Sequence, residues 1–179
     1  MTPTRPLRAR YWKINQLVAR VLEDYAIQAP PVPIKKIIRS FGIQILEGDL
    51  GDVSGLLVRN SNELLIGVNS KQSSNRQRFT LAHEFGHYLL HDSISSHFDR
   101  DYIVKYRSVE SSYATNVEEI EANYFGASLL MPKDFLINDN AIEALDSDHE
   151  VKKLAMAYKV SQHAMSLRLA NLFGDHRPF

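Results

Sequence analysis

The residues with the clearest chemical potential are His83, Glu84 and His87, which stand together in the string His83-Glu84-Phe85-Gly86-His87. Two histidines four positions apart project from the same face of a helix, one turn from each other, so both imidazoles can bind one metal ion. Glu84 lies about 100° around the helix from its neighbour and would flank the open coordination position. The spacing therefore predicts a metal site with a carboxylate beside a metal-bound water.

A site of this kind can hydrolyse a peptide bond. Zinc lowers the pKa of a bound water toward about 7, and a neighbouring carboxylate can take the proton while the water attacks a carbonyl polarised by the metal. We therefore expect Glu84 to be the general base of a zinc-dependent hydrolase. The sequence has no cysteine, so the metal ligands must be nitrogen and oxygen atoms.

A catalytic zinc site needs a third protein ligand, and residues 118–126 offer three carboxylates on an expected helix. Glu119 shares one helical face with four residues that are mostly small: Ala122, Asn123, Gly126 and Leu130. This face can press against the histidine helix, with Glu119 at the metal and Asn123 supporting a ligand histidine. Glu118 and Glu121 lie on neighbouring faces, where we expect them to point to solvent as the charged start of a helix. The same alternative stays open for Glu119.

His91 is the competing third ligand, because it follows His87 by a further four residues. Consecutive helical turns carry His91 along the helix axis, away from a metal held by His83 and His87. A histidine at this place also has two roles that need no metal: a cation at the helix C-terminus, or a histidine of the core. The spacing therefore favours Glu119 over His91.

Hydrophobic periodicity predicts the helices that must position these side chains. Apolar residues at helical spacing indicate helices over 14–25, 34–41, 79–90 and 117–130, followed by short helical pieces to the end of the chain. Ser74 and Gln77 have the spacing of a capping box at the start of the histidine helix. Gly86 costs up to about 1 kcal/mol relative to alanine in a helix interior, so we expect another backbone or a substrate close to it.

Three β-type runs, at residues 43–46, 53–58 and 64–68, are separated by turn signals and predict a small antiparallel sheet. Residues 102–106 could add a strand or an active-site loop. The expected fold class is therefore α+β, with helices packed on a small, mainly antiparallel sheet. We expect a metallopeptidase domain over residues 1–138 and a helical appendage over residues 139–179.

The composition excludes several classes of protein. The 179 residues are 44% hydrophobic and 23% charged, which is typical of a folded globular protein. Lysine plus arginine and aspartate plus glutamate number 21 each, for a net charge of zero, so the usual electrostatic argument for binding nucleic acid or acidic membranes is missing. With no cysteine, no signal peptide and no membrane-spanning stretch, the sequence predicts a cytoplasmic protein.

Two blocks of sequence together resemble the ImmA/IrrE family of metallopeptidases: residues 78–91 (RFTLAHEFGHYLLH) and residues 119–132 (EIEANYFGASLLMP). The resemblance extends over most of the chain, with residues 1–70 matching only in general character. It implies a zincin-like fold and a gluzincin-like site, with His83, His87 and Glu119 as zinc ligands and Glu84 as catalytic base. Gly126 stands where the family usually has alanine, a mild departure on the helix-packing face.

The resemblance also implies a function. It implies an endopeptidase of narrow specificity that cleaves a helix-turn-helix transcriptional repressor, in mobile-element induction or in a stress response. The alternative is a transcription-linked or partner-binding protein that keeps a structural metal site and has little proteolytic activity. Glu84 favours the enzyme, because a structural zinc site needs no carboxylate beside its ligands and closes its fourth position.

The C-terminal residues 154–172 have the pattern of a helix, a tight turn and a second helix capped by Ser161, as in a helix-turn-helix. A DNA reader carries basic and amide groups on the second helix, yet this helix has few lysines or arginines. The residues leave two alternatives open, a helical hairpin that packs on the peptidase or docks a partner, and a DNA-binding module. We favour the hairpin and expect no specific DNA binding.

Overall fold

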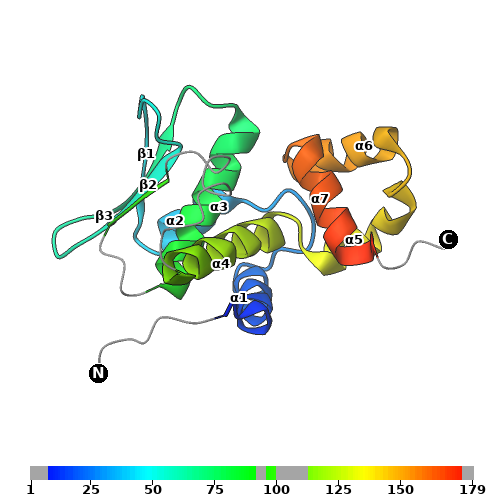
Figure 1. The fold of residues 1–179 in the computed structure, drawn as a ribbon, viewed down its shortest axis with the longest axis horizontal. Coiled ribbons are helices and arrows are strands. Elements are labelled where there is room, and N and C mark those ends of the chain that lie inside the picture. Colours follow the sequence, from blue (N-terminus) through cyan, green and yellow to red (C-terminus); the bar gives the residue numbers. More distant parts are fainter. Residues whose placement is uncertain (1–7, 92–95, 100–112, 175–179) are drawn as a thin grey trace.

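The computed structural model describes residues 8–91, 96–99 and 113–174, and in these ranges the chain has an α+β fold (Figure 1). The elements follow the order α1 (Tyr11–Asp24), α2 (Ile34–Ser40), β1 (Gln44–Gly48), β2 (Gly55–Arg59), β3 (Leu64–Asn69), α3 (Ser74–Leu90), β4 (Ser96–Asp99), α4 (Tyr113–Leu130), α5 (Lys133–Asn138), the 3₁₀ helix η2 (Ala141–Ala144), α6 (Asp148–Tyr158) and α7 (Gln162–Phe173). The predicted helices and strands are confirmed to within a few residues. The strand or loop expected at residues 102–106 lies outside the described residues.

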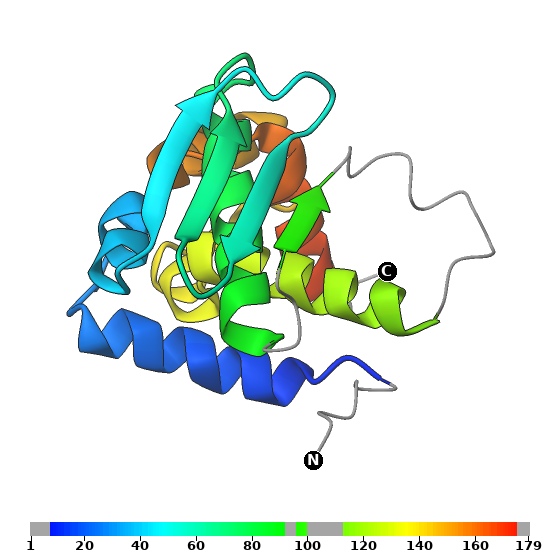
Figure 2. The ribbon, with the colours of Figure 1, turned by 90° about the vertical axis from the view of Figure 1, so that its left-hand side faces the viewer.

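The sheet has four strands in the order β1-β3-β2-β4 (Figure 2). β2 pairs antiparallel with both β3 and β4, whereas β1 runs parallel to β3. The prediction of an antiparallel sheet from the first three runs is therefore wrong for β1. β3 is the most buried of the three, so it takes the centre, with β2 as its hairpin partner on one side and β1 on the other.

α3, the helix that carries both histidines, packs against β2 and β3 and against α4. Its middle turns are almost completely buried, and apolar side chains such as Leu81 and Phe85 join Leu57 and Ile66 of the sheet in the core. The N-cap is Ser73, whose hydroxyl accepts a hydrogen bond from the backbone N–H of Arg76. The capping box predicted at Ser74 and Gln77 is therefore wrong: the helix is capped one residue earlier, by Ser73, and the Gln77 side chain donates instead to the carbonyl of Gln72.

Glycines on both helices allow α3 and α4 to approach closely. A Cβ added to Gly86 would lie 3.2 Å from the Cα of Ala122 and 3.0 Å from Cδ1 of Phe125. A Cβ added to Gly126 would lie 3.3 Å from the backbone nitrogen of His83. The prediction that Gly86 faces another backbone is confirmed, and so is the small-residue packing face of α4.

The remaining helices extend the same core. α1 packs along α4, where Tyr11 and Tyr124 make an edge-to-face contact with ring centroids 4.7 Å apart. α6 and α7 pack on each other, and the predicted cap is confirmed, because the Ser161 hydroxyl accepts from the N–H of Ala164 at 3.1 Å. None of the described helices combines the length and apolar character that a bilayer-spanning segment requires.

Candidate metal centre

His83 and His87 of α3 and Glu119 of α4 bring three potential ligand atoms together, all within 4.8 Å of one another. The two Nε2 atoms are 3.1 Å apart. Oxygens of Glu119 lie 3.6 Å from His83 Nε2 and 3.7 Å from His87 Nε2. Bonds of about 2.0–2.1 Å to a tetrahedral zinc ion would place the ligand atoms about 3.3 Å apart, so these residues fit such an ion with little movement.

The other ring nitrogens show where the protons of the two histidines lie. His83 Nδ1 is 2.8 Å from the acceptor Oδ1 of Asn123, so Nδ1 carries a proton. His87 Nδ1 is 3.0 Å from His91 Nδ1, and His91 Nε2 is 3.1 Å from a carboxylate oxygen of Glu121. Since His91 Nε2 donates to that carboxylate, neutral His91 accepts at Nδ1 from His87. The Nε2 atoms of His83 and His87 therefore both present lone pairs.

With both imidazoles neutral, the form in which histidine binds a metal, three electron-pair donors converge on one point. Two Nε2 lone pairs 3.1 Å apart repel each other unless a cation lies between them. The neighbouring carboxylate of Glu119 also favours a cation at this point. Glu119 keeps 16% of its side chain exposed, whereas His83 and His87 are almost fully buried. The centre is therefore accessible from the side of Glu119.

Glu84 lies on the same helix, fully buried, and is not one of the three grouped residues. Its Oε1 faces β2, since it would lie 3.5 Å from a Cβ added to Gly55. The same Cβ would overlap with the methyl group of Thr80. The contact with Thr80, and not the one with Glu84, therefore favours a glycine where β2 approaches α3. Sequence reasoning missed Gly55, for which the only signal was its place at the start of a strand. The role of Glu84 as a general base stays a prediction.

Glu118 and Glu121 are buried, with 4% and 0% of their surface exposed, so the expectation that they point to solvent is wrong. α4 packs against α3 and α1 at once, which leaves these faces no access to water. Of the two metal-free roles considered for His91, the structure shows the core histidine, since only 4% of it is exposed. Burial lowers the pKa of His91 more than its hydrogen bond to Glu121 raises it, which favours the neutral ring.

Glu121 is held as a carboxylate by Arg10, a residue that sequence reasoning missed. The backbone N–H, Nε and Nη2 of Arg10 donate to the two carboxylate oxygens at 2.7, 2.9 and 2.7 Å. Burial by itself would raise the pKa of Glu121, but the hydrogen bonds from Arg10 and His91 outweigh it and lower the pKa to about 2. The two residues are 111 positions apart, so no local pattern signals the pair.

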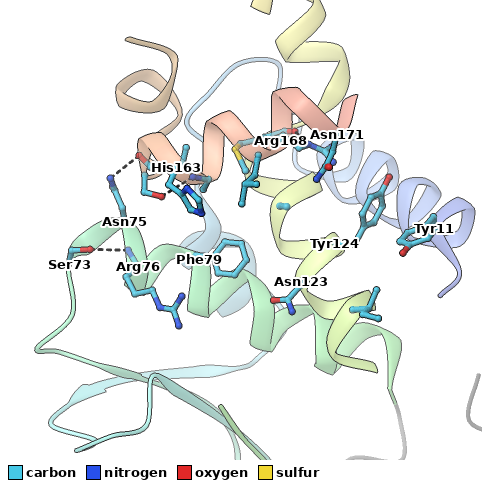
Figure 3. Close-up of a pocket in the computed structure, with 17 residues that line it drawn as sticks. Tyr11, Ser73, Asn75, Arg76, Phe79, Asn123, Tyr124, His163, Arg168 and Asn171 are labelled. Atoms are coloured by element: carbon cyan, nitrogen blue, oxygen red, sulfur yellow. Dashed lines mark hydrogen bonds between the residues drawn. The ribbon is translucent and has the colours of Figure 1, made fainter. Parts of the chain in front are cut away.

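A pocket of about 790 Å³ lies beside the candidate metal centre, with α3 and α4 on one side and α7 on the other (Figure 3). Asn123, the partner of His83, lines it together with Phe79, and Leu167 and His163 face them from α7. Among the described residues that line the pocket none is acidic. Apolar atoms make up most of the lining, and its charged members are the basic residues Arg76 and Arg168.

Comparison with known sequences gives the family. The sequence profile of the IrrE N-terminal-like domain, a peptidase family, matches residues 38–170. The chain belongs to the ImmA/IrrE family.

No curated protein matches the chain. A solved structure described as a Mycobacterium tuberculosis transcriptional regulator matches with a TM-score of 0.62 at 16% identity, over 89% of this chain and 46% of that one. This chain thus spans about half of that protein, and the likeness shows the fold alone.

Membership of the ImmA/IrrE family agrees with the resemblance found in the sequence. The matched residues 38–170 include both helices of the candidate centre and reach into α7. They also exclude Arg10, so the ion pair with Glu121 depends on a segment outside the matched region.

Proposed function

We propose that this member of the ImmA/IrrE family is a zinc-dependent endopeptidase, with His83, His87 and Glu119 as metal ligands and Glu84 as general base. One observation carries the proposal: two imidazole lone pairs and a carboxylate converge on one point, with Nε2 atoms 3.1 Å apart. Two histidines and one glutamate form a donor set that suits zinc and leaves a fourth position for water. The peptidase family matched by residues 38–170 supports the same reading.

Zinc, when bound, supplies a Lewis acid and an acidified water. Glu84 accepts the proton of the attacking water and returns it to the leaving amine of the cleaved peptide. Asn123 keeps His83 in the tautomer that turns Nε2 to the metal, by accepting from Nδ1 at 2.8 Å.

We also propose the finer classification of the fold. The chain has a zincin-like, gluzincin-type peptidase domain over residues 1–138 and a helix-turn-helix-like appendage over residues 139–179. A three-residue turn joins α6 and α7, with Lys159 in the left-handed conformation and Ser161 as the N-cap of the second helix, which supports the appendage.

The proposed substrate is a helix-turn-helix transcriptional repressor in the cytoplasm, cleaved in mobile-element induction or in a stress response. The pocket between α3, α4 and α7 supports a protein substrate, since about 790 Å³ holds several side chains of an extended chain. Its apolar lining residues Phe79 and Leu167 suit apolar side chains of the substrate.

The experiment is a cleavage assay on repressors encoded beside the gene, with the parent protein and Glu84→Gln compared after zinc analysis. We expect the parent to cut one repressor at one peptide bond. Glu84→Gln should cleave about 10²–10⁴-fold more slowly and bind as much zinc as the parent. Glu63→Gln, a change of an exposed glutamate on the β2–β3 turn, is the control and should cleave like the parent.

Each deviation from this result overturns one part of the proposal. Full activity of Glu84→Gln removes the general base. Loss of zinc in that variant makes Glu84 a ligand. Cleavage of other proteins but of no repressor removes the repressor as substrate and leaves the peptidase in place.

A further inference from the structure

A continuous chain of hydrogen bonds leads from the candidate metal centre to the segment that precedes α1. It begins at His87 Nδ1, which is 3.0 Å from His91 Nδ1, and continues from His91 Nε2 to Glu121 Oε2 over 3.1 Å. Glu121 then accepts three hydrogen bonds from Arg10. His87, His91 and Glu121 are all buried, so water does not compete for these bonds.

The charges fix the direction of every bond in the chain. Arg10 supplies only donors, and its backbone N–H, Nε and Nη2 all donate to Glu121, so the carboxylate of Glu121 acts as the acceptor in each of these bonds. The anion takes the proton of His91 Nε2, which leaves His91 Nδ1 as an acceptor. His87 must then donate from Nδ1 and present the lone pair of Nε2 toward His83 and Glu119.

The two histidines of the centre are held differently. His83 donates to the neutral amide oxygen of Asn123 at 2.8 Å. His87 donates to an imidazole that is itself backed by a buried carboxylate and a guanidinium. A carboxylate behind the ring makes an imidazole a stronger electron-pair donor and fixes its orientation. The chain therefore strengthens one side of the site.

We propose that His91, Glu121 and Arg10 are positioning residues of the metal centre, which set the tautomer and the ring orientation of His87 and thereby raise its affinity for the metal. Arg10 also hydrogen-bonds the carbonyl of Leu90 at 3.5 Å, next to His91, so the segment before α1 holds the end of the histidine helix and its buried carboxylate together. This inference rests on the metal site of the proposed function but not on peptide cleavage.

The first test is zinc affinity, measured by competition with a chelator on the full chain. His91→Phe keeps a ring at this position but offers no acceptor to His87, and we expect zinc to bind about 10–100-fold more weakly. His91→Gln has an amide that can accept from His87 and donate to Glu121, so it should recover most of the lost affinity. Equal affinities for the parent and His91→Phe would overturn the proposal, and so would equal losses in His91→Phe and His91→Gln.

Loss of fold is separated from loss of position by matched variants. Arg10→Lys keeps the charge but not the forked donors, and should weaken zinc binding by at least threefold at unchanged helix content. Glu47→Gln removes the acid of an exposed pair with Lys35 and should leave zinc affinity as in the parent. Where His91→Phe does not fold, Arg10→Lys decides: affinity within experimental error of the parent overturns the proposal.

A spectroscopic signature tests the tautomer directly. In the zinc-loaded protein, long-range ¹⁵N–¹H spectra of the imidazoles should show neutral His91 with its proton on Nε2, and His87 with its proton on Nδ1. A cationic His91, or a proton on His91 Nδ1, contradicts the inferred direction of the bonds. A protein that binds zinc with this signature but cleaves no peptide overturns the proposed peptidase function and supports the positioning chain.

Discussion

Gly86 of α3 faces the backbone of Ala122 in α4, so closely that a Cβ at residue 86 would lie 3.2 Å from the Cα and 3.3 Å from the carbonyl oxygen of Ala122. Alanine at this place would favour the helix by up to about 1 kcal/mol. Backbone atoms cannot give way as a flexible side chain can. The contact between the two helices therefore decides how near Glu119 comes to the two histidines.

Gly86→Ala is expected to lower the free energy of unfolding by about 1–2 kcal/mol, because overpacking of about 1–3 kcal/mol exceeds the gain in helix propensity. It should also weaken zinc binding, since a wider gap between α3 and α4 moves Glu119 away from His83. Urea unfolding and zinc titration are the measurements. Gly48→Ala is the control, because a Cβ there meets nothing within 4 Å. Greater stability of Gly86→Ala with unchanged zinc affinity would contradict the account.

The sequence predicts those parts of the fold that depend on local periodicity. The helix with His83 and His87 and the helix with Glu119 and Asn123 both appear where apolar spacing places them, and the small face of α4 packs as expected. The two histidines, Glu119 and Asn123 lie at one centre because both helices follow the regular 3.6-residue repeat.

Contacts between segments far apart in the chain could not be predicted from the sequence. The parallel pairing of β1 with β3 depends on which strand takes the centre of the sheet, and alternating patterns do not encode that choice. Glu121 looks like a solvent-exposed acid, but burial between α1 and α3 is possible because Arg10 supplies its charge partner from 111 residues away.

Leu167 tests the proposed role of the pocket in binding substrate. Its side chain lines the pocket from α7 and is 52% exposed, so Leu167→Asp should change the free energy of unfolding by no more than about 0.5 kcal/mol. Loss of an apolar contact with the substrate should lower kcat/KM by about tenfold or more. Met156→Asp is the matched control, because Met156 is 71% exposed on α6 and lies outside the pocket lining. Equal effects of the two variants would remove the pocket from the account.

The second C-terminal helix leads us to expect no specific DNA binding. Arg168 is the one arginine or lysine of α7, and it is 6% exposed, with Nε donating to the carbonyl of Met131 at 3.1 Å. Anisotropy titration with duplex DNA at physiological salt should give weak binding that disappears as salt is added. A sequence-specific dissociation constant of about 10⁻⁸–10⁻¹¹ M would contradict this expectation and favour the transcription-linked alternative.

Tyr158 should make the protein sensitive to alkaline pH. Its side chain is fully buried and its hydroxyl donates to Asp139 at 2.6 Å. Burial first, and then the bond to Asp139, raise the pKa of Tyr158 above its usual value of 10.0. The folded state therefore holds this proton more tightly than the unfolded state, so the contribution of Tyr158 to stability is full below about pH 10 and is lost as the pH rises further.

Tyr158→Phe should lose about 1 kcal/mol of stability at pH 7, because one hydrogen bond is removed, and should show a weaker decline of stability above pH 10. Urea unfolding at pH 7, 9 and 11 measures both effects. Tyr11→Phe, at a tyrosine that is 47% exposed, is the control and should keep the alkaline decline of the parent. An identical decline in Tyr158→Phe would show that another group causes it.

The most direct test of the account is the zinc content of the purified parent protein, measured by elemental analysis beside His83→Ala and Glu119→Gln. We expect about one zinc ion per chain in the parent, because the Nε2 atoms of His83 and His87 lie 3.1 Å apart with the carboxylate of Glu119 beside them. Both variants should lose most of that zinc while keeping their helix content. Retention of one zinc ion in both variants would place the metal elsewhere and show that His83, His87 and Glu119 do not form the site.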